Sequence, residues 1–359
     1  MVLRRILTSA ASGFDKTVGT AMLVRGDMIR SFDPAGLGPE ARIDLLSTIR
    51  AIYDKPEFFT APSSFFGEPT IPHVELARVR LLGGPDPGMV LDATWPSEFE
   101  PLEASVRTDY LCHTLNRTAT ARLFLHATPR PVVILVHGYR CGAFALEERL
   151  WPVPWIFELG LDVAMAVLPF HACRAPKGTA LFPSPDMRFT IEGFRQAIMD
   201  LRALAALLCD RGASSVGVMG MSLGGYTTGL WATIDPTLAF AVPIVPCASI
   251  ADVARAVGLL VGTPEQQAAQ HQAIEATLRV VSPLGRSALI PSERFLVVGA
   301  AGDQITPLDH ARRMAEHFHA PLETFHGGHL LQFGRADAFR AVRRMLARIG
   351  IIETRHAAA

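Results

Sequence analysis

A serine at the junction of a predicted strand and a predicted helix constrains this chain more than any other feature. The apolar run over 215–220 predicts a buried strand, and it ends in a Gly-x-Ser-x-Gly pattern centred on Ser222. A helical pattern begins directly afterwards. Glycines two positions before and after the serine leave room for a tight, strained turn. Such a turn holds the hydroxyl at the end of the sheet above a helix N-terminus, which favours Ser222 as a nucleophile.

Three further motifs follow predicted strands. The strand over 132–137 leads into His137-Gly138, the strand over 293–300 into a loop with Asp303, and the strand over 321–326 into Gly327-Gly328-His329. With the serine, acid and histidine in this chain order, residues from roughly 74 to 350 resemble the α/β-hydrolase superfamily. The resemblance implies an α/β-hydrolase fold: a mostly parallel twisted sheet with helices on both faces.

The three candidate catalytic residues have complementary roles. A serine hydroxyl is a weak nucleophile at neutral pH, so it needs an adjacent base and a group that orients the base. We assign Ser222 as nucleophile, His329 as base and Asp303 as the orienting acid. Each follows the C-terminal end of a predicted strand. Because parallel strands bring those ends to one edge of the sheet, the three residues are expected to meet there.

Other residues could compete for these roles. His326 falls within a predicted strand, whereas His329 follows two glycines on a loop. Asp309 falls in a helical pattern, and Asp252 follows the preceding strand only at a distance. Asp303 itself could instead cap the helix predicted to begin near 307.

An oxyanion requires preorganised donors. The backbone N–H of Leu223 is one candidate, and the N–H of Tyr139 is the favoured second, with that of Arg140 as the alternative. His137 is expected to brace this loop rather than to transfer protons.

The loop after the strand predicted over 162–168 carries His171, Arg174 and Lys177. These side chains could bind a carboxylate or phosphate of a substrate. The alternative, which we favour, is a solvated loop in which Arg174 holds a nearby backbone carbonyl.

The chain divides into an N-terminal helical and irregular arm over 1–72 and an α/β-hydrolase domain over 73–355. The sheet is expected to start with an antiparallel edge, formed by a hairpin over 73–82 and 89–95 and a strand over 118–126. An insertion at about 248–290 predicts a small helical cap over the site. The arm carries four phenylalanines, Phe58, Phe59, Phe65 and Phe66, which are expected to pack on the domain near the entrance to the site.

Helical patterns alternate with the later strands. They cover 43–53 in the arm, then 147–159, 194–211, 223–234, 250–260, 264–280, 307–319 and 336–349.

Composition excludes several function classes. Of 359 residues, 34 are Lys or Arg and 34 are Asp or Glu, so charge offers no case for binding nucleic acid. The five cysteines form no CxxC pair, which indicates neither a disulfide framework nor a zinc site and favours a cytoplasmic location. No run is long enough for a membrane span, and the N-terminus lacks the continuous apolar stretch of a signal peptide. No cofactor or metal is expected.

We therefore expect a serine hydrolase that cleaves an acyl bond of a small molecule, most simply a carboxylic ester, through an acyl-enzyme. An acyltransferase or thioesterase on the same triad, and a non-catalytic binding protein of the same fold, stay open. A homodimer formed through the arm is a further possibility.

Overall fold

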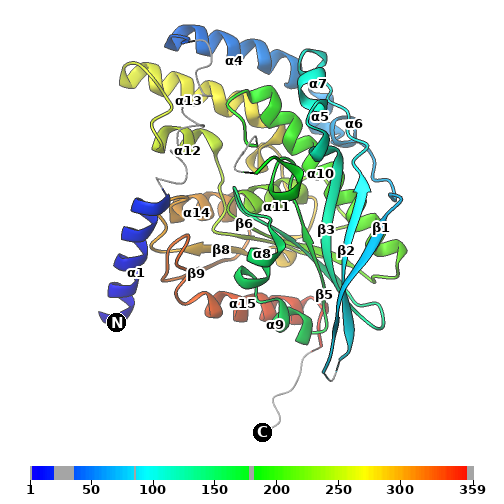
Figure 1. The fold of residues 1–359 in the computed structure, drawn as a ribbon. Helices are drawn as coiled ribbons and strands as arrows, with labels where there is room; N and C mark the ends of the chain where they lie inside the picture. The colour runs from blue at the N-terminus through cyan, green and yellow to red at the C-terminus, as the bar shows by residue number, and fades with distance from the viewer. Residues whose placement is uncertain (1, 20–35, 85, 178–181, 354–359) are drawn as a thin grey trace.

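A computed structural model describes residues 2–19, 36–84, 86–177 and 182–353. Its centre is a nine-stranded sheet in the order β1-β2-β3-β5-β4-β6-β7-β8-β9 (Figure 1). The strands are β1 (Glu75–Leu82), β2 (Gly88–Pro96), β3 (Thr118–His126), β4 (Val132–Val136), β5 (Asp162–Ala166), β6 (Val216–Met221), β7 (Ala241–Ile244), β8 (Val297–Ala300) and β9 (Leu322–Phe325).

The sheet confirms the predicted fold class. β1, β2 and β3 pair antiparallel, and β3 pairs antiparallel with β5. From β5 to β9 every pairing is parallel. The central strands are buried on both faces, as their continuous apolar sequences predict. The C-terminal ends of β6, β8 and β9 therefore share one edge of the sheet.

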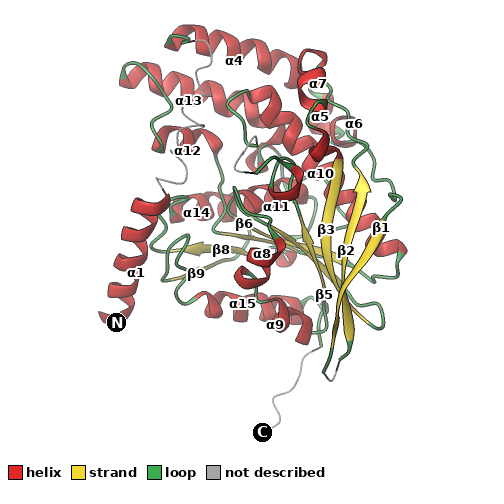
Figure 2. Ribbon diagram, viewed as in Figure 1, coloured by secondary structure: helices red, strands yellow, loops and turns green. Residues whose placement is uncertain are grey.

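Helices cover both faces of the sheet (Figure 2). One face packs against α10 (Met187–Asp210), α11 (Leu223–Ala232) and α14 (Leu308–His317), whose apolar residues join the larger of the two core clusters. The other face packs against α8 (Phe144–Leu150), α9 (Val153–Glu158) and α15 (Arg335–Arg348). Because helices cover both faces, the central parallel strands do not alternate polar with apolar residues.

The helix predicted over 147–159 is wrong in one respect, because the structure divides it into α8 and α9. Pro152 separates the two helices, and the residue before it, Trp151, has extended φ and ψ of −90° and 141°. A proline lacks the N–H that a continuing helix requires, and it disfavours helical geometry in the preceding residue.

Two other helices differ from expectation. α10 begins at Met187 rather than at 194, because the Asp186 side chain caps it by accepting a hydrogen bond from the Arg188 N–H. α7 (Ala104–Leu111) was not predicted, because its polar and apolar residues follow no clear helical period. Its buried residues are Val106 and Tyr110.

The second half of the arm packs on the domain through two regions. α4 (Pro39–Tyr53) lies alongside α13 (Pro264–Leu278), as Figure 1 shows at the top of the molecule. The short helices α5 (Glu57–Thr60) and α6 (Ser63–Phe66) bury Phe58, Phe65 and Phe66 against the domain. Arg195 of α10 lies over the Phe65 ring, and its Nε donates to the Phe65 carbonyl.

A different part of the arm reaches the far edge of the sheet. α1 (Val2–Phe14) continues into one π-helical segment, η1 (Asp15–Gly19), beside the loops that follow β8 and β9. No regular structure was predicted for these residues. The cap consists of α12 (Ile250–Ala256) and α13, both inserted between β7 and β8.

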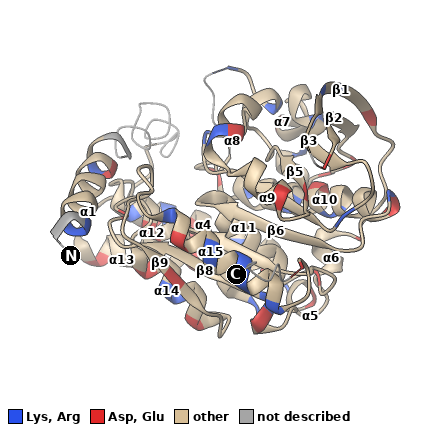
Figure 3. Ribbon diagram, turned by 90° about the horizontal axis from the view of Figure 1, so that it is seen from below, with Lys and Arg blue, Asp and Glu red and all other residues tan. Residues whose placement is uncertain are grey.

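Residues of opposite charge are interspersed along the ribbon rather than gathered in one region (Figure 3). In the described ranges, none of the helices combines the length and the apolar character that crossing a membrane requires.

Candidate active site

Ser222 lies at the strained turn that the sequence predicts. It follows β6, precedes α11 and has a positive φ of 56° with ψ of −112°. Backbone hydrogen bonds fix this conformation: the Ser222 N–H donates to the Ile244 carbonyl, and the Ser222 carbonyl accepts from Tyr226. A non-glycine residue persists in this region only where its surroundings enforce it.

The glycines of the motif are required by close backbone contacts. A Cβ at Gly220 would lie 2.0 Å from the Gly224 carbonyl oxygen, and a Cβ at Gly224 would lie 2.1 Å from the Val136 carbonyl oxygen. Neither backbone can move away without breaking the sheet or the helix. The Gly-x-Ser-x-Gly pattern is therefore explained by the packing of β4, β6 and α11 around the serine.

Asp303 and His329 form a buried pair. Asp303 Oδ2 lies 2.7 Å from His329 Nδ1, and the two side chains are 1% and 9% exposed. The other carboxylate oxygen of Asp303 accepts hydrogen bonds from the N–H groups of Ile305 and Thr306, each at 2.8 Å. These bonds hold the carboxylate so that its Oδ2 faces the imidazole.

Thr306 contacts both members of this pair. Its Oγ1 lies 3.0 Å from His329 Nδ1 and 3.1 Å from Asp303 Oδ2. Thr306 also lines a cavity of about 90 Å³ together with Ser222, Leu223 and Tyr139. The sequence analysis did not single out Thr306; its position three residues after an aspartate in a turn was the only signal.

The structure brings Asp303 and His329 into contact but contains no hydrogen bond between His329 and Ser222, although all three residues are described. In structures without substrate, catalytic hydrogen bonds are often long and form only in the complex.

The competing residues are engaged elsewhere. Asp252 forms ion pairs with His271 and Arg313. Asp309 is exposed on the first turn of α14. The ring of His326 packs against Gly334, where a Cβ would lie 2.3 Å from the imidazole. Asp303 and His329 pair with one another, and Ile305 and Thr306 of the acid loop line the Ser222 cavity.

The electrostatic environment of His329 favours its protonated form. Burial alone disfavours an imidazolium, but the Asp303 carboxylate opposes it by charge and hydrogen bonding, and Asp15 adds a smaller attraction. Together the carboxylates raise the pKa of His329 above its usual value. A histidine in this setting accepts a proton more readily than a free imidazole.

Asp15 is a site residue that the sequence analysis missed. Its carboxylate is fully buried and accepts hydrogen bonds from the N–H groups of His329 and Leu330 in the histidine loop, and from Gln304 in the acid loop. Its only sequence signal is that it is the sole acidic residue among the first 26. A side chain of the arm therefore joins the two loops that hold His329 and Asp303.

Two neighbouring side chains of α1 strengthen this connection. Thr8 Oγ1 donates to the His326 carbonyl at 2.6 Å, and Ser12 Oγ donates to the Gly302 carbonyl at 2.8 Å. With Asp15, they attach one side of α1 and η1 to both loops.

The loop over 137–143 lies beside Ser222. A Cβ placed on Gly138 would be 4.0 Å from Ser222 Oγ, so the glycine permits a close approach. His137 braces this loop: its Nε2 accepts from the Leu168 N–H at 3.0 Å, and its Nδ1 lies 2.7 Å from the Gly138 carbonyl. Burial lowers the pKa of His137 to about 3, which keeps the ring neutral and suits a structural role.

The loop after β5 contains a structural arginine. Arg174 is 1% exposed, and it donates to the backbone carbonyls of Val167 and Asn116 and to the Asp200 carboxylate. The favoured alternative was right that Arg174 holds backbone carbonyls but wrong that it does so in a solvated loop, because the arginine is buried. Its burial leaves it no access to a substrate anion. Within the described residues, no cluster of three or more His, Cys, Asp or Glu side chains is placed to hold a metal ion.

The fold has many counterparts among solved structures. Acetyl xylan esterases from Paenibacillus sp. R4 and Thermoanaerobacterium sp. JW/SL YS485 each superpose with a TM-score of 0.55, at 15% and 16% identity. The superpositions cover 84% and 85% of this chain and 99% and 98% of the esterases. An S-formylglutathione hydrolase from Agrobacterium tumefaciens has a TM-score of 0.50 at 16% identity, covering 76% of this chain and 99% of that one. These likenesses show that the chain has the α/β-hydrolase fold.

Sequence comparison identifies nearer relatives. The chain is 31% identical over 314 residues to the uncharacterized protein Rv2627c of Mycobacterium tuberculosis, covering 84% of this chain and 74% of that protein. It is 32% identical over 255 residues to the uncharacterized protein MT2702 of the same species, covering 68% and 60%. This chain and Rv2627c are members of one family. No protein-family model matches the chain.

Proposed function

We propose that this protein is a serine hydrolase that cleaves a carboxylic ester through an acyl-enzyme. The observation that carries the proposal is the buried Asp303–His329 hydrogen bond beside the cavity where Ser222 stands on a strained turn. The solved structures that share the fold include esterases, which is the reaction class proposed here.

In the first half-reaction, His329 Nε2 removes the proton from Ser222 Oγ as the oxygen attacks the ester carbonyl carbon. Asp303 holds the imidazole with its Nδ1–H toward the carboxylate and stabilises the imidazolium that forms. The negative charge on the carbonyl oxygen is then stabilised by the N–H groups of Leu223 and Tyr139. His329 gives the proton to the departing alcohol, and the acyl group stays on Ser222.

The second half-reaction uses the same groups with water as the nucleophile. His329 takes a proton from water, which attacks the acyl-enzyme, and Ser222 leaves as the alcohol when the proton returns to it. An acceptor alcohol in place of water would turn the reaction into acyl transfer.

A fluorophosphonate probe tests the proposal directly. We expect covalent labelling at Ser222 in the wild type, no labelling in Ser222→Ala and almost none in His329→Ala, measured by mass spectrometry of the intact protein and its peptides. Ser292→Ala, on an exposed serine far along the chain, is the matched control and should label normally. A folded wild-type protein that resists the probe and hydrolyses no p-nitrophenyl ester would instead indicate a non-catalytic binding protein.

The contacts of Asp15 lead to a prediction for the pH dependence. Asp15→Asn keeps the size of the side chain but replaces one acceptor oxygen with an NH₂ group that faces backbone N–H groups. We expect kcat to fall by about 10- to 100-fold, because small displacements of a catalytic group are costly. The lost charge should also lower the pKa of His329, since Asp15 helps to raise it.

The base form of His329 exists only above its pKa, so activity falls as the pH drops through that value. The acid limb of kcat/KM should therefore move to lower pH in Asp15→Asn. The measurement is a pH–rate profile of p-nitrophenyl ester hydrolysis, with circular dichroism to confirm folding. Ser12→Ala removes a hydrogen bond of the same helix without a charge, so its acid limb should stay in place. Unchanged kcat and pH profile in Asp15→Asn would reduce Asp15 to a purely structural role.

A further inference from the structure

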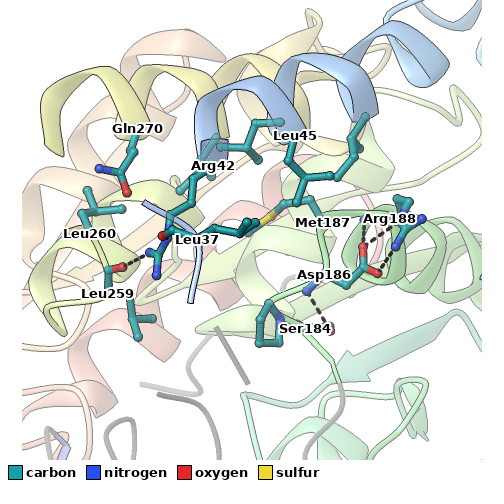
Figure 4. Close-up of a pocket in the computed structure, with 14 residues that line it drawn as sticks. Leu37, Arg42, Leu45, Ser184, Asp186, Met187, Arg188, Leu259, Leu260 and Gln270 are labelled. Carbon is teal, nitrogen blue, oxygen red and sulfur yellow. Dashed lines mark hydrogen bonds and ion pairs between the residues drawn. The ribbon is translucent and has the colours of Figure 1, made fainter. Parts of the chain in front are cut away.

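A second cavity, of about 260 Å³, lies between the arm, the start of α10 and the cap (Figure 4). Three elements far apart in sequence supply its walls: α4, the residues around the N-terminus of α10, and the cap. Its apolar lining includes Leu45, Leu46 and Ile49 from α4, Met187 from α10, and Leu260 and Ile274 from the cap. Neither the triad nor the oxyanion loop contributes to it.

This cavity adjoins the one at Ser222. Ser184 and Leu259 line both cavities, so the two cavities are neighbours. On the Ser222 side, the cap helix α12 contributes Ile250, Val253 and Val257 to the wall. Apolar side chains of the cap therefore line the Ser222 cavity, and the second cavity adjoins it under α4.

The polar residues that line the second cavity are bonded to the protein itself. Arg42 donates to the carbonyls of Leu37 and Leu259. Asp186 and Arg188 form a two-pronged ion pair, drawn as dashed lines in Figure 4. The Gln270 side-chain amide donates to two backbone carbonyls of the cap.

Since these groups already have partners, the cavity offers a ligand hydrocarbon surface rather than hydrogen bonds. A polar or charged ligand would lose its hydration there without replacing it. An unbranched alkyl chain has no hydrogen bonds to water that it would have to give up, and its binding removes apolar surface from water.

We infer that the space under α4 binds the alkyl chain of the acyl group, so that the substrates are esters of medium- or long-chain fatty acids. The inference rests on the proposed function, because it takes Ser222 as the point from which the chain extends. In this arrangement the arm forms part of the substrate site, and α4 selects substrates by the length of their acyl chain.

A chain-length series tests the inference. With p-nitrophenyl esters from acetate to dodecanoate, kcat/KM should rise through the medium chain lengths, because each methylene that becomes buried can add up to about fourfold. Leu45→Trp is the informative variant. Leu45 lines the cavity and is 46% exposed, so an indole can enter the space without replacing a core residue.

We expect Leu45→Trp to lower the ratio of kcat/KM for decanoate over acetate esters by about tenfold or more. The matched control is Leu81→Trp, because Leu81 is exposed on the edge strand β1 and lines neither cavity. It should leave the ratio unchanged. A wild-type preference for acetate, or a ratio that Leu45→Trp does not change, would overturn the inference and leave the proposed hydrolase intact.

A binding experiment separates the inference from the proposed function. Ser222→Ala should bind sodium decanoate but not sodium acetate in isothermal titration calorimetry, and adding Leu45→Trp should abolish decanoate binding. If no ester is hydrolysed and the fluorophosphonate probe fails, the hydrolase proposal falls, yet decanoate binding that is lost with Leu45→Trp would still support the alkyl site. Absence of decanoate binding to Ser222→Ala would overturn it.

Discussion

Replacing Ser222 with alanine is expected to lower kcat for ester hydrolysis by about 10⁶-fold, and removing His329 as well is expected to cost almost nothing more. The physical reason is that the two residues act in one step. Without the hydroxyl there is no proton for the imidazole to take, and without the imidazole the hydroxyl is a poor nucleophile. If the two substitutions impaired separate steps, their reductions in kcat would multiply in the double variant. Because both impair the same step, the double variant should be about as slow as Ser222→Ala alone.

The measurement is the steady-state hydrolysis of a p-nitrophenyl ester by Ser222→Ala, His329→Ala and the double variant, at enzyme concentrations high enough to detect the residual rate. His326→Ala is the matched control, because His326 lies three residues from His329 and packs against Gly334 rather than Asp303. It should retain most of the activity. A double variant much slower than either single variant would show that the two residues do not work together.

Asp303→Asn is expected to lower kcat by about 10⁴-fold while the protein stays folded. In the wild type, Oδ1 of Asp303 accepts two backbone N–H groups and Oδ2 accepts the Nδ1–H of His329. The asparagine oxygen can still accept the two N–H groups, so its NH₂ must face the imidazole. That arrangement turns Nδ1 into an acceptor and puts the proton on Nε2, where the base is needed.

This prediction is checked by kcat measurements together with thermal unfolding. Asp309→Asn provides the control, since Asp309 is an exposed aspartate six residues further along the chain. It should alter neither quantity appreciably. If Asp303→Asn retained most of its activity, the role of Asp303 would be limited to capping its own turn, the alternative that the sequence left open.

The fold and the positions of the candidate catalytic residues were predictable because their signals are local. The strands before Ser222 and Asp303 are short apolar runs with a glycine at or near the end, and His329 follows a Gly-Gly pair after β9. In a parallel sheet, the end of a strand determines where the next residue lies. The same local rules failed at Trp151–Pro152, where the apolar pattern continues but the backbone cannot.

The contacts of the arm could not be predicted in this way. Asp15 lies 314 positions from His329, and nothing in its neighbouring residues indicates that its carboxylate would meet the N–H groups of that loop. The space under α4 likewise exists only because the arm, α10 and the cap pack against one another.

The sequence by itself determined the sheet, the strained turn at Ser222 and the positions of Asp303 and His329 after their strands, because strand periodicity and turn geometry depend on adjacent residues. Only the tertiary structure decided that an N-terminal carboxylate supports the histidine loop and that an apolar space adjoins the serine. Both features arise from packing between segments hundreds of residues apart, and no local pattern of side chains encodes such a contact.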